Sequence, residues 1–89
     1  MQLTNKDAQE FLRQFSSLFT KGYMINVKIK RIKSYGDLLH IMVSRPNNFG
    51  VGEEHVSADF VLKMIKNPIE LETYAKRWIE GFKSPKTSI

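Results

Sequence analysis

Apolar residues recur at every third or fourth position between residues 8 and 19, the spacing that places side chains on one face of an α-helix. Thr4 can accept a hydrogen bond from the free amides at the helix start, and Asp7, three residues later, completes a capping-box spacing. Gly22 suits the left-handed conformation that ends many helices. The pattern predicts a helix that opens at Thr4, stops at Gly22 and buries one stripe, formed by Ala8, Phe11, Leu12, Phe15, Leu18 and Phe19.

Apolar and polar residues alternate on either side of residues 34–36, which predicts two half-buried strands joined as a hairpin. If residues 34–36 form a three-residue loop with its glycine in the left-handed position, Lys33 lies opposite Asp37 and Ile29 lies opposite Ile41. A two-stranded hairpin alone is not stable in water, so helices should cover its apolar face. That face is predicted to contain Ile25, Val27, Ile29, Leu39, Ile41 and Val43.

The remaining chain predicts a loop and two more helices. Residues 47–55 contain two glycines and no helical period, and the pattern leaves open whether residues 49–51 add a short third strand. Ser57 is suited to cap a second helix, which Asn67 and Pro68 end while they start a third. The third helix should bury a stripe formed by Leu71, Tyr74, Ala75, Trp78, Ile79 and Phe82.

These elements predict a small α+β domain of order α-β-β-α-α, with an antiparallel hairpin and helices packed on one of its faces. A chain of 89 residues with 42% hydrophobic and 26% charged residues has the composition of one ordinary globular domain. We expect a single compact domain over residues 1–84 and a flexible tail over residues 85–89, which include a proline and polar side chains.

Composition narrows the possible location and chemistry. The sequence has no cysteine, which excludes disulfides, thiolate metal sites and cysteine nucleophiles and is compatible with a reducing compartment. The first ten residues are polar, and no apolar run approaches the roughly 20 residues that a membrane span requires. We therefore expect a cytoplasmic protein that does not act in a membrane.

Positive charge is concentrated on the predicted hairpin. Residues 21–45 hold six basic residues and one acidic residue, a net charge of +5, while the rest of the chain holds eight of each and sums to zero. Such a surface attracts phosphate backbones or acidic proteins. The candidate contact residues on and beside the outward hairpin face are Lys28, Lys30, Arg31, Lys33, Tyr35, His40, Met42 and Arg45.

Other candidate chemistry is weaker. Gly50 and Gly52 lack the lysine and hydroxyl residue of a phosphate-binding loop, and the two glutamates that follow would repel phosphate. Glu53, Glu54 and His55 are metal-type ligands, but adjacent positions rarely converge on one ion. No serine stands in a recognisable catalytic motif. We expect no enzyme activity, no metal and no cofactor.

The opening order of helix, hairpin and helix resembles that of double-stranded RNA-binding domains. The basic motif that opens the later helix in those domains is absent from residues 57–62, so no residue roles are transferred. Short, cysteine-free domains without a catalytic constellation are common among accessory proteins of phages and mobile elements. Such proteins often bind a host protein or a nucleic acid.

Two functions fit the sequence. In the first, the basic hairpin face binds a DNA or RNA backbone with little base reading. In the second, the protein is an inhibitor or adaptor that docks the same face on an acidic protein, with Ile32, Leu38 and Met42 as the apolar centre. A third reading assigns no partner, because lysines on an exposed strand also discourage edge-to-edge aggregation.

Overall fold

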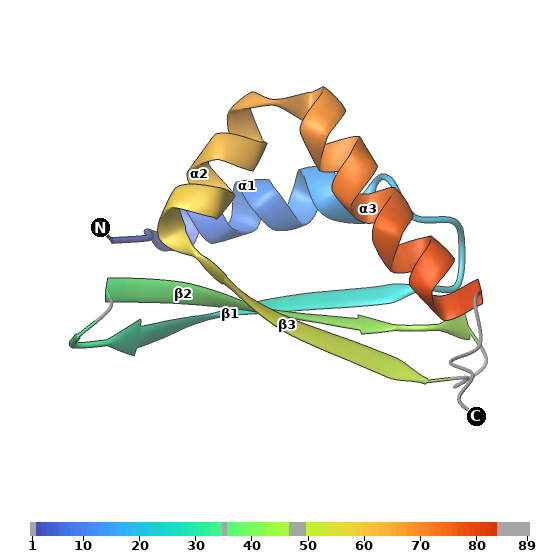
Figure 1. Ribbon diagram of the computed structural model, residues 1–89, viewed down its shortest axis with the longest axis horizontal. Helices are drawn as coiled ribbons and strands as arrows, with labels where there is room; N and C mark the ends of the chain where they lie inside the picture. Colours follow the sequence, from blue (N-terminus) through green and yellow to red (C-terminus); the bar gives the residue numbers. More distant parts are fainter. Residues whose placement is uncertain (1, 35, 47–49, 84–89) are drawn as a thin grey trace.

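The computed structural model describes residues 2–34, 36–46 and 50–83, and it has the element order α-β-β-β-α-α. All three helices lie on one side of a three-stranded antiparallel sheet, as Figure 1 shows. The α+β class and the helices on a single face of the hairpin are therefore confirmed. The elements are α1 (Asn5–Ser16), β1 (Met24–Ile32), β2 (Gly36–Ser44), β3 (Val51–Ser57), α2 (Ala58–Lys66) and α3 (Pro68–Lys83).

Helix α1 begins as predicted and ends earlier. Thr4 Oγ1 accepts the Asp7 N–H at 3.0 Å, and the Asp7 carboxylate accepts the Thr4 N–H at 3.1 Å, which completes the capping box. The α-helix ends at Ser16, where the hydroxyls of Ser16 and Ser17 donate back to main-chain carbonyls. Gly22 has the expected positive φ of 99°, but it lies in the loop before β1 and not at the helix end.

The hairpin has the predicted faces and a different register. Ile29 lies opposite Leu39, two residues from the predicted partner, and Arg31 takes the place opposite Asp37. The shift arises because Gly36, with φ of 85°, pairs with Ile32 and belongs to the strand and not to the loop. A shift of two residues leaves every side chain on its predicted face.

The loop predicted over residues 47–55 is wrong for its second half. Residues Val51–Ser57 form β3, which pairs with β2 from Ser44↔Val51 to Leu38↔Ser57. The optional strand at 49–51 is thus replaced by a longer strand that starts at Val51, and residues 47–49 lie outside the described residues. In this edge strand only Val56 is buried, so the sequence lacks the alternation that marks a strand.

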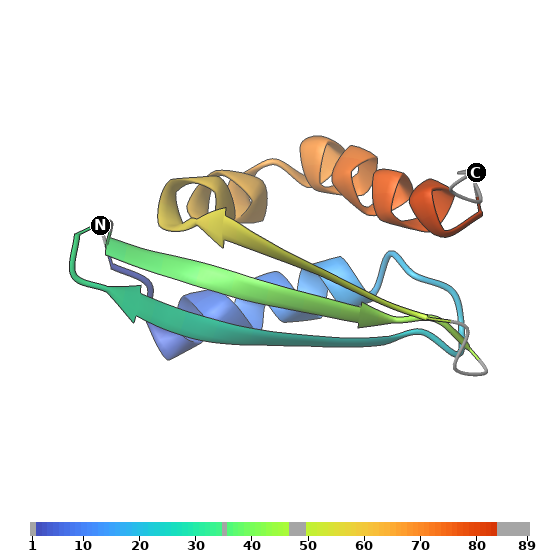
Figure 2. The ribbon, with the colours of Figure 1, turned by 60° about the horizontal axis from the view of Figure 1, so that its bottom comes forward.

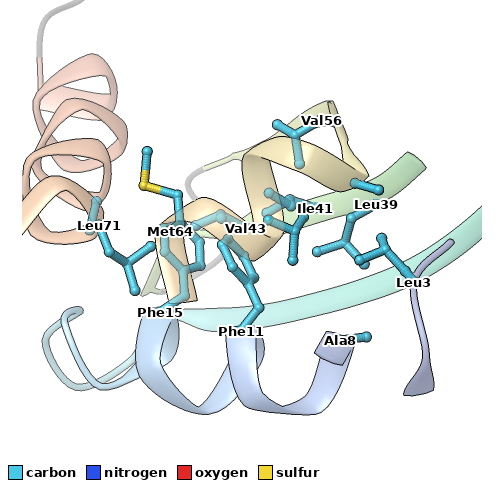
Figure 3. Close-up of a cluster of buried hydrophobic side chains, with 13 residues drawn as sticks. Leu3, Ala8, Phe11, Phe15, Leu39, Ile41, Val43, Val56, Met64 and Leu71 are labelled. Carbon is cyan, nitrogen blue, oxygen red and sulfur yellow. The ribbon is translucent and has the colours of Figure 1, made fainter. Parts of the chain in front are cut away.

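The core lies between the inner face of the sheet and the helices. Figure 3 shows Phe11 and Phe15 rising from α1 toward Ile41 and Val43 of β2. Leu71 and Ala75 of α3 are buried as the helical stripe predicts, whereas Trp78 is only partly buried. The side chain of Phe82 and the predicted tail at 85–89 lie outside the described part of the chain.

The helices divide the inner face between them. In Figure 2, α1 lies on the β1 side of the helical layer, and α2 with α3 lies on the β3 side. Glu54 of β3 points inward and accepts a hydrogen bond from the Tyr74 hydroxyl of α3. Burial is the main cause that raises the pKa of the Tyr74 hydroxyl, and the hydrogen bond to Glu54 raises it further.

Candidate interaction surface

The side of the sheet that faces away from the helices is called the open face below. Strand alternation assigns its side chains, and no described helix or strand lies over it. Its members on β1 are Met24, Asn26, Lys28, Lys30 and Ile32; on β2, Leu38, His40, Met42 and Ser44; and on β3, Val51, Glu53, His55 and Ser57.

Two of the predicted lysines lie together on this face. Lys28 and Lys30 are exposed, two residues apart on β1, opposite His40 and Leu38 of β2. Neither belongs to an ion pair within the described residues. Lys33 is also exposed and follows directly after the end of β1. These lysines make the β1 side of the open face positive and accessible to a partner.

Arg31 lies on the other face. Its guanidinium Nη1 is 2.5 Å from Oδ2 of Asp37, whose side chain is only 6% exposed, while the Arg31 side chain is 59% exposed. Asp37 Oδ2 also accepts the main-chain N–H of Leu3 at 2.7 Å, and Arg31 donates to the Leu3 carbonyl at 3.4 Å. Arg31 and Asp37 thus fasten the N-terminal segment to the sheet, and the charge of Arg31 is matched locally.

Arg45 does not join the lysines on the open face. Arg45 is partly buried directly after β2, at the end of the hairpin opposite to Lys33, and its N–H donates to the Gly50 carbonyl at 2.9 Å. Tyr35 lies outside the described residues. Of the candidate residues, the structure therefore brings Lys28, Lys30, His40 and Met42 together on one face, with Lys33 at its end.

A histidine pair occupies the middle of the open face. The rings of His40 and His55 stack with centroids 4.3 Å apart and an interplanar angle of 13°. Nε2 of His40 is 2.7 Å from Oε1 of Glu53. The sequence prediction missed this cluster, because it placed Glu53 and His55 in a loop; only recognition of β3 could have revealed it. Within the described ranges, no group of three or more metal-type ligands is arranged to hold an ion.

Apolar side chains lie between the charges. Ile32, Leu38 and Met42 are partly buried on the open face, and Met24 and Val51 at its far end are 65% and 64% exposed. From β1 to β3 the surface therefore passes from lysines through apolar side chains to an acidic residue, Glu53. The open face thus combines exposed lysines, the partly buried Leu38 and Met42 on either side of the histidine pair, and Glu53.

Comparison with known proteins yields no relative. No family model matches the chain, and neither the curated proteins nor the solved structures contain a match. Among the described residues, no helix has the length and apolar character needed to cross a membrane.

Proposed function

We propose that this protein is a non-enzymatic interaction module that docks its open face on an acidic partner protein in the cytoplasm, as an inhibitor or adaptor. The observation that carries the proposal is the pair of partly buried apolar side chains, Leu38 and Met42, that flank the histidine pair beside Lys28 and Lys30 on a face that no described element covers. Lysines steer an acidic partner to such a surface, and apolar side chains hold it there.

The same geometry favours a protein partner over a nucleic-acid backbone. The +5 of residues 21–45 does not form one basic surface, since Arg31 pairs with Asp37 on the inner face and Arg45 lies at the opposite end of the hairpin. The described members of this face include no phenylalanine, tyrosine or tryptophan, and its imidazole rings, those of His40 and His55, stack on each other.

Site-specific photo-crosslinking in the cells that express the protein tests the proposal. A benzoylphenylalanine replaces Met42 on the open face, and a control places it at Ile69 of α3, which is 80% exposed on the helical side. We expect a discrete adduct at position 42 that resists nuclease, is absent at position 69 and is lost in the Lys28→Glu/Lys30→Glu variant. The adduct is identified by mass spectrometry and formed again from the two purified proteins.

The proposal fails if the only adducts are nuclease-sensitive, if none forms, or if charge reversal leaves the adduct unchanged. Gel shifts with duplex DNA and duplex RNA at low salt provide the matching test of the nucleic-acid function. Retardation by the wild-type protein, with a log–log salt slope that falls by roughly 1.8 in the double variant on duplex DNA, would indicate two lost phosphate contacts and support that function instead.

A further inference from the structure

The inner face of the sheet is incompletely covered along β1. Leu39 and Ile41 of β2 are fully buried at 0% exposure, whereas Val27 and Ile29, their neighbours on β1, remain partly exposed on the same face. β1 is also an edge strand, because the sheet order is β1-β2-β3. One side of its nine-residue backbone therefore pairs with no described strand.

A groove of about 500 Å³ runs between α1 and this edge. Its apolar lining consists of Ala8 and Leu12 from α1 with Val27 and Ile29 from β1, and its polar lining includes Gln9, Lys28 and Arg31. Val27 and Ile29 point toward the helices, while Lys28 points to the open face. A groove lined by both sets must follow the backbone edge of β1, on the side where Figure 2 shows α1.

We propose that this groove takes an extended segment of the partner protein, which adds to β1 as a fourth strand. Added strands gain affinity from main-chain hydrogen bonds and selectivity from alternate side chains. One set of the segment's side chains would enter the groove beside Leu12, Val27 and Ile29 and should be apolar. The other set would lie on the open face beside Lys28 and Lys30 and should be acidic.

This inference rests on the proposed function for the class of partner and adds the mode of binding and the kind of sequence recognised. Charge complementarity selects the occupant: Lys28, Lys30 and Lys33 accompany the edge, so a basic segment would be repelled. A phosphate backbone has no amide groups to pair with β1 and no apolar side chains for the groove.

Peptides of defined sequence test the inference. The probe is a fluorescein-labelled nonapeptide of alternating valine and glutamate, and its control has lysine in place of glutamate; fluorescence anisotropy measures binding. We expect the glutamate peptide to bind the wild-type protein and the lysine peptide not to bind it. The Lys28→Glu/Lys30→Glu variant should bind it about ten- to hundredfold more weakly, because two attractive pairs become repulsive. Lys66→Glu/Lys76→Glu, with the same charge change at exposed helical positions, should bind as the wild type does.

Backbone methylation distinguishes strand addition from other docking. Two further peptides carry N-methyl groups on the odd or on the even residues, and only alternate amides of an added strand face its neighbour. One series should lose binding and the other should match the parent peptide. Equal binding of both series, or no binding of any peptide while the Met42 adduct persists, overturns strand addition and leaves the proposed function intact. If neither the Met42 adduct nor peptide binding is observed, the proposed function and strand addition are both overturned.

A second copy of this chain is the competing occupant, because its β3 edge carries Glu53 and Glu54. Light scattering without peptide should show a monomer at the concentrations used for anisotropy. Concentration-dependent association that the peptide reverses would place another copy in the groove and overturn the assignment of a partner segment.

Discussion

Replacing Asp37 by alanine should destabilise the fold by about 2–3 kcal/mol. The carboxylate is 6% exposed and accepts the Leu3 N–H at 2.7 Å, and a bond between a main-chain amide and a charged group contributes roughly 1.5–3 kcal/mol. The ion pair with Arg31 adds at most about 1 kcal/mol, because that side chain is 59% exposed and its charge is screened. The alanine variant no longer buries a carboxylate, and the desolvation free energy that is saved offsets part of the loss in stability.

Urea unfolding followed by circular dichroism measures the change, and Asp37→Asn and Arg31→Ala separate the contributions. The asparagine retains an acceptor for the Leu3 N–H, so each of these two variants should cost only about 1 kcal/mol. At roughly 4–8 °C per kcal/mol for a domain of this size, Asp37→Ala should lower the melting temperature by about 10–20 °C. An Arg31→Ala cost equal to that of Asp37→Ala would show that the ion pair dominates, and would refute the assignment to the Leu3 amide.

Three further predictions concern the helices. Phe15→Ala should cost about 3–5 kcal/mol in urea unfolding because the ring is fully buried, and a loss below about 2 kcal/mol would show that the core collapses around the gap. Ser57→Ala should cost about 1 kcal/mol, since Ser57 Oγ accepts the Phe60 N–H at 3.1 Å; Ser57→Asp should restore it, and an unrescued loss would argue against capping. The hydrogen bond from Arg13 lowers the pKa of Glu10 from 4.5 to about 2, so the stabilisation that the Glu10 carboxylate contributes is present above pH 4.5 and is lost as the pH falls toward 2. Acid unfolding of the Glu10→Gln variant should lack this loss of stability, and identical acid unfolding profiles of the variant and the wild type would contradict the prediction.

The sequence predicts the parts of this fold that depend on local signals. Thr4 and Ser57 cap their helices as expected, because capping requires only a few neighbouring residues. The faces of the hairpin follow from alternation, which survives a register shift of two. The register itself depended on whether Gly36 joins the loop or the strand, and the composition of the turn does not decide between them.

The features that the sequence did not predict depend on contacts between residues far apart in the chain. β3 forms on β2, and only Val56 of its seven residues is buried, so the edge strand carries little hydrophobic signal of its own. The pairing of Arg31 with Asp37 follows from the true register and from the Leu3 amide, 34 residues from Asp37. Alternation alone places Arg31 on the face of Val27 and Ile29, away from Lys28 and Lys30, so the candidate contact residues were grouped by their charge and not by their face.

The sign of the charge on β1 distinguishes docking from protection of a sheet edge. Lysines that only prevent edge-to-edge pairing act by repulsion between like charges and by hydration, and glutamates at the same positions provide both. Because Lys28 and Lys30 are exposed, the Lys28→Glu/Lys30→Glu variant should retain the stability and solubility of the wild-type protein under either reading. Docking on an acidic partner requires positive charge, so the Met42 adduct and peptide binding should be lost only if these lysines recognise a partner. A variant that stays folded and soluble and keeps both interactions would show that the lysines protect the edge and do nothing more.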